Sequence, residues 1–409
     1  MRKFGGGCRA VKKAFIYDAI RSPRTKAKDS GGLHEITPTE LLAQLHQKLA
    51  QRVQLDPSMV SEVVLGCVTQ QGEQAANVAK TSTLLAGWPS SIAGLTINRF
   101  CSSSIDAVAI AALKVGAGQS SAMLAGGVEM MSRVPLLADG ARVFSDHEFG
   151  VMHQMLLMGA GADLIATRAG ATREACDEVA YLSHQRALAA QNQGRFSSIV
   201  PGETSSGDVL LDECIRPSLT RERLAEMPAA FAKLGADGSD SVQRAAFHDI
   251  GGISHVHTAA NSPSMCDGAG VLLVGDEQLQ RDLSVRPKVE ILDAVTCCAE
   301  PLEVVGGCVA ATSEILQRNQ LTPPDVDVLE IHEAFAATIV KLQHELGIEP
   351  HTVNVNGGCI ALGHPMGATG AIMIGTAIDE LYRSGGELAV VAASGAAGSG
   401  SAMLLQRCH

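Results

Sequence analysis

Short apolar runs alternate along the chain with amphipathic or alanine-rich segments. Runs of β-branched and other apolar residues predict strands at 14–20, 62–66, 94–97, 121–126, 327–331 and 388–394. Between them, leucines at helical spacing in 40–49 and alanine-rich segments at 107–115 and 310–317 predict helices. This alternation favours an α/β protein with a mixed, mostly parallel sheet covered by helices.

The chain contains a distant repeat of the pattern Q-L-x-P-x-x-V, which starts at Gln54 and again at Gln320. Each copy directly precedes a predicted strand. Further downstream, the first copy leads to Cys101 and the second to His364, each just before an alanine- and glycine-rich helix. The order of these matched segments indicates an internal duplication. Duplicated α/β halves place strand ends and helix N-termini at a common crevice, where ligands bind.

The pattern predicts an N-terminal half at 14–278 and a C-terminal half at 285–409. Residues 133–260 depart from the strand–helix alternation. Within them, 133–158 is loop-like and rich in methionine, and 172–186 has a clear helical pattern with a Thr N-cap. We expect this segment to be an insertion that lies over the duplicated core as a substrate-binding lid.

Composition limits the classes of partner. The chain has 409 residues, 46% hydrophobic and 18% charged, which indicates a globular protein with a large core. A net charge of -11 argues against a nucleic-acid or anionic-membrane surface but not against a phosphorylated ligand. Because no apolar run is long enough to span a membrane and the basic leader at 1–13 lacks a signal-peptide core, we expect a cytoplasmic protein with reduced cysteines.

Cys101 lies between the predicted strand 94–97 and the predicted helix 107–115. Three serines, 102–104, supply N-cap residues for that helix. A helix N-terminus offers unpaired N–H groups and a positive dipole end, which lower the pKa of a nearby thiol. The sequence therefore predicts a thiolate nucleophile at Cys101, against the plainer interpretation of a small buried cysteine. That role requires a base from elsewhere in the chain.

Two histidines are candidates for that base. His332 directly follows the predicted strand 327–331, and His364 lies among five glycines between residues 356 and 370. A lone histidine is usually an ordinary surface or core residue, but so many glycines favour a close approach of the backbone to a ligand. By contrast, His255 and His257 would share a strand face without carboxylate or thiolate partners, and we expect no metal site.

Five ordered motifs carry a resemblance to a known family. They are N-R-F-C-S-S at 98–103, G-G-V-E at 126–129, A-A-N-S with D-G-A between 259 and 269, H-E-A-F at 332–335, and G-G followed by G-H-P and G-A-T-G at 357–370. From about residue 14 to the C-terminus, the chain resembles the thiolases, which are coenzyme A-dependent acyltransferases. The resemblance implies a five-layered αβαβα core of two duplicated halves, an inserted loop domain, and a dimer or tetramer.

The resemblance also implies roles for individual residues. Cys101 corresponds to the nucleophile that carries the acyl group as a thioester, and His364 to the histidine that activates it. Together with His364, His332 would polarise the thioester oxygen of the acyl-CoA. Backbone N–H groups of Cys101 and Ala396 would form a second oxyanion hole, because acyl transfer develops negative charge on a carbonyl oxygen.

Ser394 departs from the family pattern, which has a second cysteine there as the acid and base of the reaction. A serine hydroxyl is a poor general base. Three explanations remain open: a slow or specialised thiolase, substitution by another thiol such as Cys359, or a Cys-His-His site like that of decarboxylating ketoacyl synthases. The order around Pro263 is also unusual, so that either Ser262 or Ser264 corresponds to the serine that contacts coenzyme A.

The expected activity is that of an acyl-CoA:acetyl-CoA C-acyltransferase, which cleaves 3-oxoacyl-CoA or runs the reverse Claisen condensation, in fatty-acid β-oxidation. The alternatives are a decarboxylating condensing enzyme and a catalytically impaired relative. The resemblance implies acyl-CoA and coenzyme A as substrates and no permanently bound cofactor. A homodimer or homotetramer, with or without a β-oxidation partner subunit, is the expected assembly.

Overall fold

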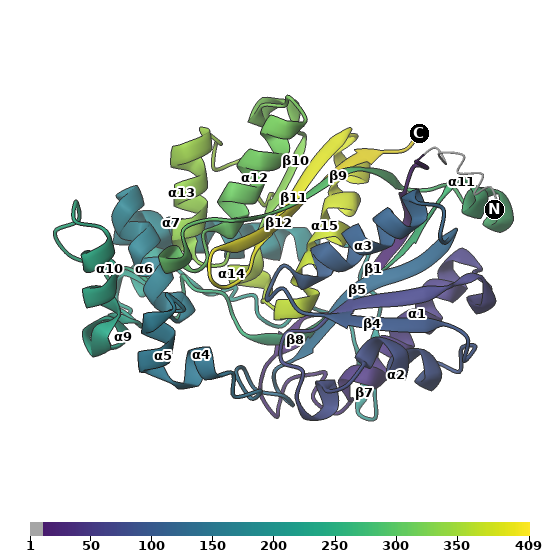
Figure 1. Cartoon of the computed structure of the whole chain (residues 1–409), viewed down its shortest axis with the longest axis horizontal. Helices are drawn as coiled ribbons and strands as arrows, with labels where there is room; N and C mark the ends of the chain where they lie inside the picture. Colours follow the sequence, from purple (N-terminus) through teal and green to yellow (C-terminus); the bar gives the residue numbers. More distant parts are fainter. Residues whose placement is uncertain (1–10) are drawn as a thin grey trace, which may run out of the picture.

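A computed structural model describes residues 11–409 (Figure 1). Its main sheet has ten strands, with β2 lying off the main path beside β8. The strands are β1 (Phe15–Arg21), β2 (Thr25–Lys26), β3 (Glu62–Gly66), β4 (Ala93–Ile97), β5 (Ala122–Met130), β8 (Cys266–Gly275), β9 (Val289–Cys298), β10 (Val328–Ile331), β11 (Leu388–Ser394) and β12 (Ser399–Arg407). A separate hairpin pairs β6 (Gly202–Thr204) with β7 (Gly207–Val209).

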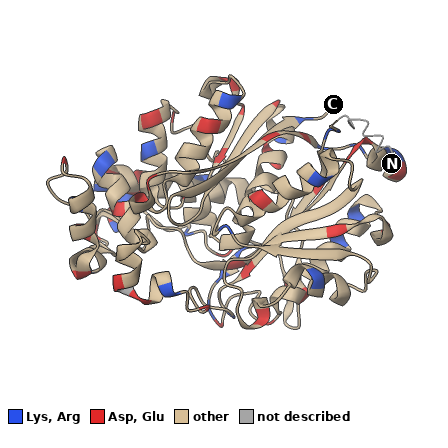
Figure 2. Cartoon of the chain, in the orientation of Figure 1, with Lys and Arg blue, Asp and Glu red and all other residues tan. Residues whose placement is uncertain are grey.

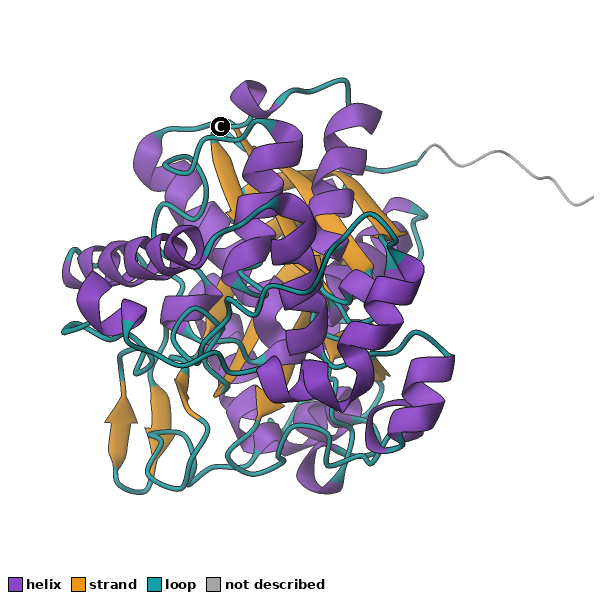
Figure 3. Cartoon of the chain, turned by 90° about the vertical axis from the view of Figure 1, so that its left-hand side faces the viewer, coloured by secondary structure: helices purple, strands orange, loops and turns teal. Residues whose placement is uncertain are grey.

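Helices enclose this sheet, as the view turned by 90° shows (Figure 3). They are α1 (Pro38–Val53), α2 (Val78–Leu85), α3 (Ser103–Gly116), α4 (Arg142–Ser145), α5 (His147–Met152), α6 (Met158–Ala169), α7 (Arg173–Asn192), α8 (Arg221–Ala225), α9 (Ala232–Leu234), α10 (Asp240–Ala246), α11 (Glu277–Leu283), α12 (Gly307–Arg318), α13 (Ala336–Leu346), α14 (Cys359–Leu362) and α15 (Thr369–Ser384).

Strand order repeats in the two halves of the sheet. The first half runs β1-β8-β5-β3-β4 and the second runs β9-β12-β11-β10. In the first half β3 pairs in parallel with both β4 and β5, in the second half β10 pairs in parallel with β11, and antiparallel pairs follow in each half. The halves join where β1 pairs with β9, through Phe15 with Glu290 and Ile16 with Val289. The repeated order confirms the duplication that the sequence indicates.

Three apolar clusters fill the spaces between the five layers. One cluster joins α1 and α2 to the outer face of the first half-sheet. A second joins both half-sheets to α3 and α15, which lie between them. A third joins α12 and α13 to the outer face of the second half-sheet. The predicted αβαβα core is therefore confirmed, with alanine-rich helices in the middle because small side chains allow close approach on several sides.

Local differences from the predicted elements have physical reasons. Helix α1 begins at Pro38, with Thr37 and Glu40 forming a capping box at its first turn, and it extends past the predicted leucine pattern of 40–49 to Val53. The predicted strand 94–97 is present as β4, but it is a half-exposed edge strand and not the buried strand that its apolar residues suggest. The 133–158 segment, predicted as a loop, contains the short helices α4 and α5. The predicted half boundaries at 278 and 285 stay predictions.

The inserted segment has its own small core. Its helices α6 and α7 bury apolar side chains together with residues of α8 and α13. Thr172 caps α7 by accepting a hydrogen bond from the Ala175 N–H at 3.2 Å. In Figure 1, helices α4 to α7, α9 and α10 gather at the left end of the molecule. The insertion therefore forms its own group of helices at one end of the molecule, and its role as a lid stays a prediction.

Charged side chains lie mainly on the outer helices and loops, with few on the central strands (Figure 2). Among residues 11–409, no helix is long and apolar enough to cross a membrane. The cysteines within this range are all free thiols. The predicted basic leader begins in residues 1–10, which lie outside the described part of the chain.

Candidate active site

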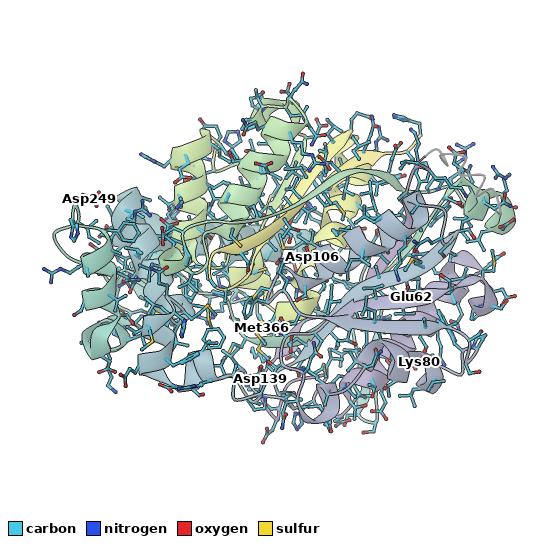
Figure 4. The ribbon with its side chains drawn as sticks, in the orientation of Figure 1. Glu62, Lys80, Asp106, Asp139, Asp249 and Met366 are labelled. Atoms are coloured by element: carbon cyan, nitrogen blue, oxygen red, sulfur yellow. The ribbon has the colours of Figure 1, made fainter. Side chains whose placement is uncertain are left out.

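A cavity of about 680 Å³ lies between the insertion and the duplicated core. Its walls are mostly apolar, and the insertion contributes Leu136, Leu137, Phe144 and Met158 among others. The predicted site residues meet in it: Cys101, His332, His364, Ser394, Ala396 and Ser262 all line the cavity. Figure 4 labels two further lining residues, Asp139 and Met366, near the middle of the molecule. A cavity of this size and polarity suits an organic ligand.

Cys101 lies at the junction that the sequence predicts, after β4 and before the first turn of α3. The turn into this position needs a left-handed residue, and Phe100 has φ +50°. Asn98 stabilises the turn because its Oδ1 accepts the Phe100 N–H at 2.7 Å. Ser103 Oγ accepts the Arg99 N–H at 2.8 Å. The loop at residues 98–103 is therefore held by the side chains of Asn98 and Ser103, on either side of Cys101.

The predicted lowering of the Cys101 pKa is wrong. Burial raises the pKa of this thiol to about 12, and the nearby Glu129 carboxylate adds to the rise. In this apolar surrounding, desolvation of a thiolate outweighs the helix N-terminus. The Cys101 thiol is therefore neutral at rest, and it would have to lose its proton to a base in order to act as a nucleophile.

We expect alkylation of Cys101 by iodoacetamide to report this raised pKa. Because only the thiolate reacts, the rate should rise about tenfold per pH unit between about pH 7 and 9 without a plateau. Peptide mapping after timed alkylation measures the rate at Cys101 itself. A plateau near neutral pH would show a preformed thiolate and contradict the raised pKa.

His364 lies after α14 and before α15, in a position of the second half that matches Cys101 in the first. Its Nδ1 is 2.7 Å from Thr369 Oγ1, and its backbone N–H donates to the Ser264 carbonyl at 2.8 Å. Burial lowers its pKa well below the usual value, with a further contribution from His332. His364 is therefore neutral, and when Nδ1 donates to Thr369, Nε2 can accept a proton.

His332 directly follows β10 and lies against His364, with ring centroids 4.3 Å apart. Burial lowers the pKa of His332 to about 4. Neither ring nitrogen of this buried side chain has a hydrogen-bond partner among the described residues. Since an unpaired buried donor or acceptor is costly, this imidazole is available for a bound ligand.

Two buried carboxylates hold the histidine loops in place. Glu129 accepts N–H groups of Val68 at 3.0 Å, Thr69 at 3.1 Å and Gly367 at 3.0 Å, linking the end of β5 to the His364 loop. A Cβ at Gly367 would lie 2.8 Å from the Cys67 Cα, so this approach requires glycine. Glu333 accepts the Ile360 N–H at 3.0 Å and fixes α14.

Ser394 ends β11 and is buried. Its hydroxyl donates to the Val305 carbonyl at 2.6 Å and accepts the Cys308 N–H at 2.8 Å. Both hydrogen bonds are to the backbone, and the Ser394 hydroxyl proton is donated to a carbonyl oxygen. The bond from the Cys308 N–H links β11 to α12. This arrangement gives Ser394 a structural link and no group that would raise its basicity.

Cys359 is the first residue of α14 and is buried beside the two imidazoles. One ligand atom of each of Cys359, His332 and His364 lies within 4.8 Å of the others. Burial raises the pKa of the Cys359 thiol above its usual range. Cys359 is not among the residues that line the large cavity, so its thiol lies next to the imidazole pair but outside the cavity wall.

The two candidate serines for coenzyme A differ in position. Ser262 lines the cavity, with its hydroxyl donating to the Thr258 carbonyl at 2.6 Å. Ser264 is not among the lining residues, and its carbonyl instead anchors His364. Ala396 lies in the turn after β11, lines the cavity, and belongs to the apolar cluster of the insertion helices.

His255 and His257 are not on a strand, as the spacing suggested, but in an extended loop. Both point at one buried carboxylate: His255 Nδ1 is 2.8 Å and His257 Nδ1 is 2.7 Å from Asp163. This cluster stabilises the insertion, and it accounts for both histidines.

Sequence reasoning missed the supporting roles of Glu129, Glu333 and Thr369. The first two lie within the quoted motifs, and a charged residue inside a buried, glycine-rich motif is a signal for a loop anchor. Thr369 lies five residues after His364 in the G-A-T-G motif, and nothing in its spacing indicates contact with the imidazole.

Comparisons with known proteins agree with this geometry. The family model described as thiolase, N-terminal domain, matches residues 14–239, and thiolase, C-terminal domain, matches residues 285–407. A 3-oxoadipyl-CoA/3-oxo-5,6-dehydrosuberyl-CoA thiolase of Escherichia coli is 36% identical, over 97% of this chain and 100% of its own. A steroid 3-ketoacyl-CoA thiolase of Mycobacterium tuberculosis is 32% identical, over 98% of this chain and 96% of its own.

Solved structures show the same fold. The acetyl-CoA acetyltransferase of Bacillus anthracis superposes with a TM-score of 0.82 at 30% identity, over 98% of this chain and 100% of its own. Human mitochondrial 3-ketoacyl-CoA thiolase gives a TM-score of 0.84 at 27% identity, with the same coverage. The fold is thus shared over nearly the whole length of the chain. The chain belongs to the thiolase family of acyltransferases.

Proposed function

We propose that this thiolase cleaves 3-oxoacyl-CoA with coenzyme A through an acyl-thioester on Cys101, with His364 as the base that takes the thiol proton. The observation that carries this proposal is the meeting of Cys101, His364 and His332 in one apolar cavity. The Cys101 thiol attacks the 3-oxo carbon as its proton passes to His364, and the bond between C2 and C3 of the substrate then breaks. In a second proton transfer the departing carbanion takes up one proton, whose net source is the Cys101 thiol, and leaves as acetyl-CoA. Coenzyme A then takes the acyl group from Cys101.

The site must also supply hydrogen-bond donors for the negative charge that develops on the substrate during the reaction. The attacked carbonyl oxygen becomes negative in each half-reaction, and fixed N–H donors stabilise it best. We assign one oxyanion site to His332 and His364, and the other to the backbone N–H groups of Cys101 and Ala396. Ser262, as the lining serine of the two candidates, is the group we place against the pantetheine arm.

The cavity lining favours an apolar acyl chain. Among the described lining residues there is no Lys or Arg, and Asp139 is the only Asp or Glu. A terminal carboxylate on the acyl chain would enter this cavity without a cationic partner, which costs several kcal/mol. We therefore propose unbranched 3-oxoacyl-CoA as the substrate class, in fatty-acid degradation, although some relatives act on 3-oxoadipyl-CoA.

A matched pair of substrates tests this assignment. 3-Oxohexanoyl-CoA and 3-oxoadipyl-CoA have equal chain length and differ in the terminal carboxylate. We expect kcat/KM for thiolysis to be at least about 100-fold higher for 3-oxohexanoyl-CoA, because the buried carboxylate stays unpaired. Equal values, or a preference for 3-oxoadipyl-CoA, would contradict the proposed substrate class. No thiolysis of either would contradict the proposed reaction.

Two substitutions test whether Ser394 or Cys359 acts as the acid and base in the second proton transfer. We propose that the Ser394 hydroxyl is structural and that Ser394→Cys therefore raises the thiolysis rate by about 10- to 100-fold, since a thiol is a better acid and base. Cys359→Ala is the paired variant. A loss of more than about tenfold in Cys359→Ala would identify Cys359 as the working thiol, acting through the imidazoles. An unchanged rate in Ser394→Cys would contradict the proposal that the site lacks an acid and base that a thiol at residue 394 can supply.

A decarboxylating condensation is the second candidate, favoured by the Cys-His-His arrangement with the Ser394 hydroxyl bound to the backbone. In that reaction the loss of carbon dioxide replaces removal of a proton. Malonyl-CoA added to the acylated enzyme distinguishes the two reactions. Formation of a 3-oxoacyl product faster from malonyl-CoA than from acetyl-CoA would favour this candidate over thiolysis.

We also propose a homodimer or homotetramer. Strand β4 is an edge of the main sheet with half-exposed apolar residues, and the neighbouring α3 exposes Leu113. Unpaired edges of this kind are normally covered. Mass from light scattering should equal at least two chains, and a single-chain mass would contradict this. A partner subunit of β-oxidation and a cytoplasmic location remain part of the same proposal.

A further inference from the structure

The cluster of His332, Cys359 and His364 combines three donor atoms that prefer soft or borderline metal ions. They come from three separate places in the fold: the end of β10, the start of α14, and the loop before α15. Their ligand atoms lie within 4.8 Å of one another. The sequence predicts no metal site because the three are not spaced as a motif, and only the fold brings them together.

Each member can act as a ligand without losing another essential contact. Neither nitrogen of His332 has a partner among the described residues, although the side chain is buried. His364 has Nδ1 against Thr369 Oγ1 at 2.7 Å, which leaves Nε2 free. A second-sphere partner on the other ring nitrogen is typical of a histidine that binds a metal. Cys359 is the first residue of α14, and its buried sulfur is the third ligand atom of the cluster.

We propose that His332, Cys359 and His364 form a binding site for Zn²⁺ or a similar borderline divalent ion, and that the bound ion reversibly inhibits acyl transfer. Two imidazoles and one thiolate make a donor set that zinc prefers. A tetrahedral zinc holds its ligand atoms roughly 3.3–3.8 Å apart, so the side chains close by about 1 Å around it. The fourth position faces the large cavity, because His332 and His364 line it.

The chemical balance of binding is simple. Zn²⁺ takes the Nε2 lone pair of His364, a lone pair of His332 and the sulfur of Cys359, whose thiol proton passes to solvent. No electron is transferred. With its lone pair in the metal bond, His364 cannot accept the Cys101 proton, and acylation stops until a chelator removes the ion. This consequence for activity rests on the proposed function, whereas metal binding itself does not.

Cobalt titration of the full chain, without coenzyme A, tests the site directly. Co²⁺ replaces Zn²⁺ and gives a sulfur-to-cobalt charge-transfer band only where a thiolate is a ligand. We expect one Co²⁺ per chain, with this band and the visible bands of a tetrahedral site. In Cys359→Ala the band should disappear and the affinity should fall at least about tenfold. Cys359→Ser keeps the side-chain size and should give the same loss if alanine perturbs folding.

Cys308→Ala is the matched control. Its sulfur is also buried near His332 but faces the His332 backbone carbonyl, at 3.7 Å, and it is outside the three-residue cluster. It should retain the band and the wild-type affinity. A band that persists in Cys359→Ala, or is absent from the wild type, would overturn the proposed site. If the metal binds at Cys359 but the rate of Cys101 acylation is unchanged, the inhibition is wrong and the metal site stands. If the metal-free protein shows no thiolysis, the proposed function is wrong and the metal site stands.

Discussion

Replacement of Cys101 with alanine is expected to abolish thiolysis, with a loss of at least about 10⁴-fold in kcat. The loss should be large because the cavity then has no thiol that can accept the acyl group. Cys101 is the cysteine that lines the large cavity, and the other thiol beside the imidazoles, Cys359, does not. Steady-state thiolysis of 3-oxohexanoyl-CoA, followed at the 3-oxoacyl absorbance, measures the loss.

The exposed Cys298 at the end of β9 provides the control for Cys101→Ala. Cys298→Ala should keep the wild-type rate, which shows that the assay responds to one thiol and not to cysteine loss in general. Thermal melting of both variants checks folding. Thiolysis by Cys101→Ala within tenfold of the wild type would contradict the assignment of the nucleophile.

Replacement of His364 with alanine is expected to lower the rate of Cys101 acylation by about 10²- to 10⁴-fold. The effect should be large because burial keeps the Cys101 pKa near 12, so the thiol needs a base within the site. The remaining activity should also rise steadily with pH, since hydroxide must then remove the proton. In the wild type the neutral imidazole does this, and the rate near neutral pH should depend less on pH.

Thr369→Val tests the positioning of the same imidazole. It removes the hydroxyl next to His364 Nδ1 and keeps the side-chain shape. We expect a loss of about tenfold, smaller than that of His364→Ala, with the wild-type dependence on pH. If His364→Ala acylates Cys101 as fast as Thr369→Val does, then His364 is not the base.

Much of the fold could be predicted from the sequence because the pattern is local. The strand 62–66 and the strand 388–394 have the same bounds in the structure. The repeat that starts at Gln54 and Gln320 reports the duplication, since each copy precedes corresponding strands, β3 and β10. The five motifs likewise placed Cys101, His332 and His364 in one site, and the structure brings all three into one cavity.

The properties that the sequence could not provide depend on distant neighbours. The helix N-terminus predicts an acidic Cys101 thiol, but Glu129 and the apolar surroundings come from other segments and reverse the direction of the pKa shift. The edge position of β4 depends on strand order, which its five residues do not encode. In the sequence, Ser394 stands where the family pattern has a catalytic cysteine. Its hydrogen bonds with Val305 and Cys308 join segments that are distant along the chain, so only the structure shows them.

The most direct test of the central claim is the mass of the acylated chain. Incubation with acetyl-CoA, followed by rapid acid quenching and peptide mapping, should give one acetyl group, located on the peptide that contains Cys101. Added coenzyme A should remove this group before quenching, and the His364→Ala variant should acquire it far more slowly. Acetylation at Cys359 or at another cysteine, or no acetylated peptide at all, would contradict an acyl-thioester on Cys101.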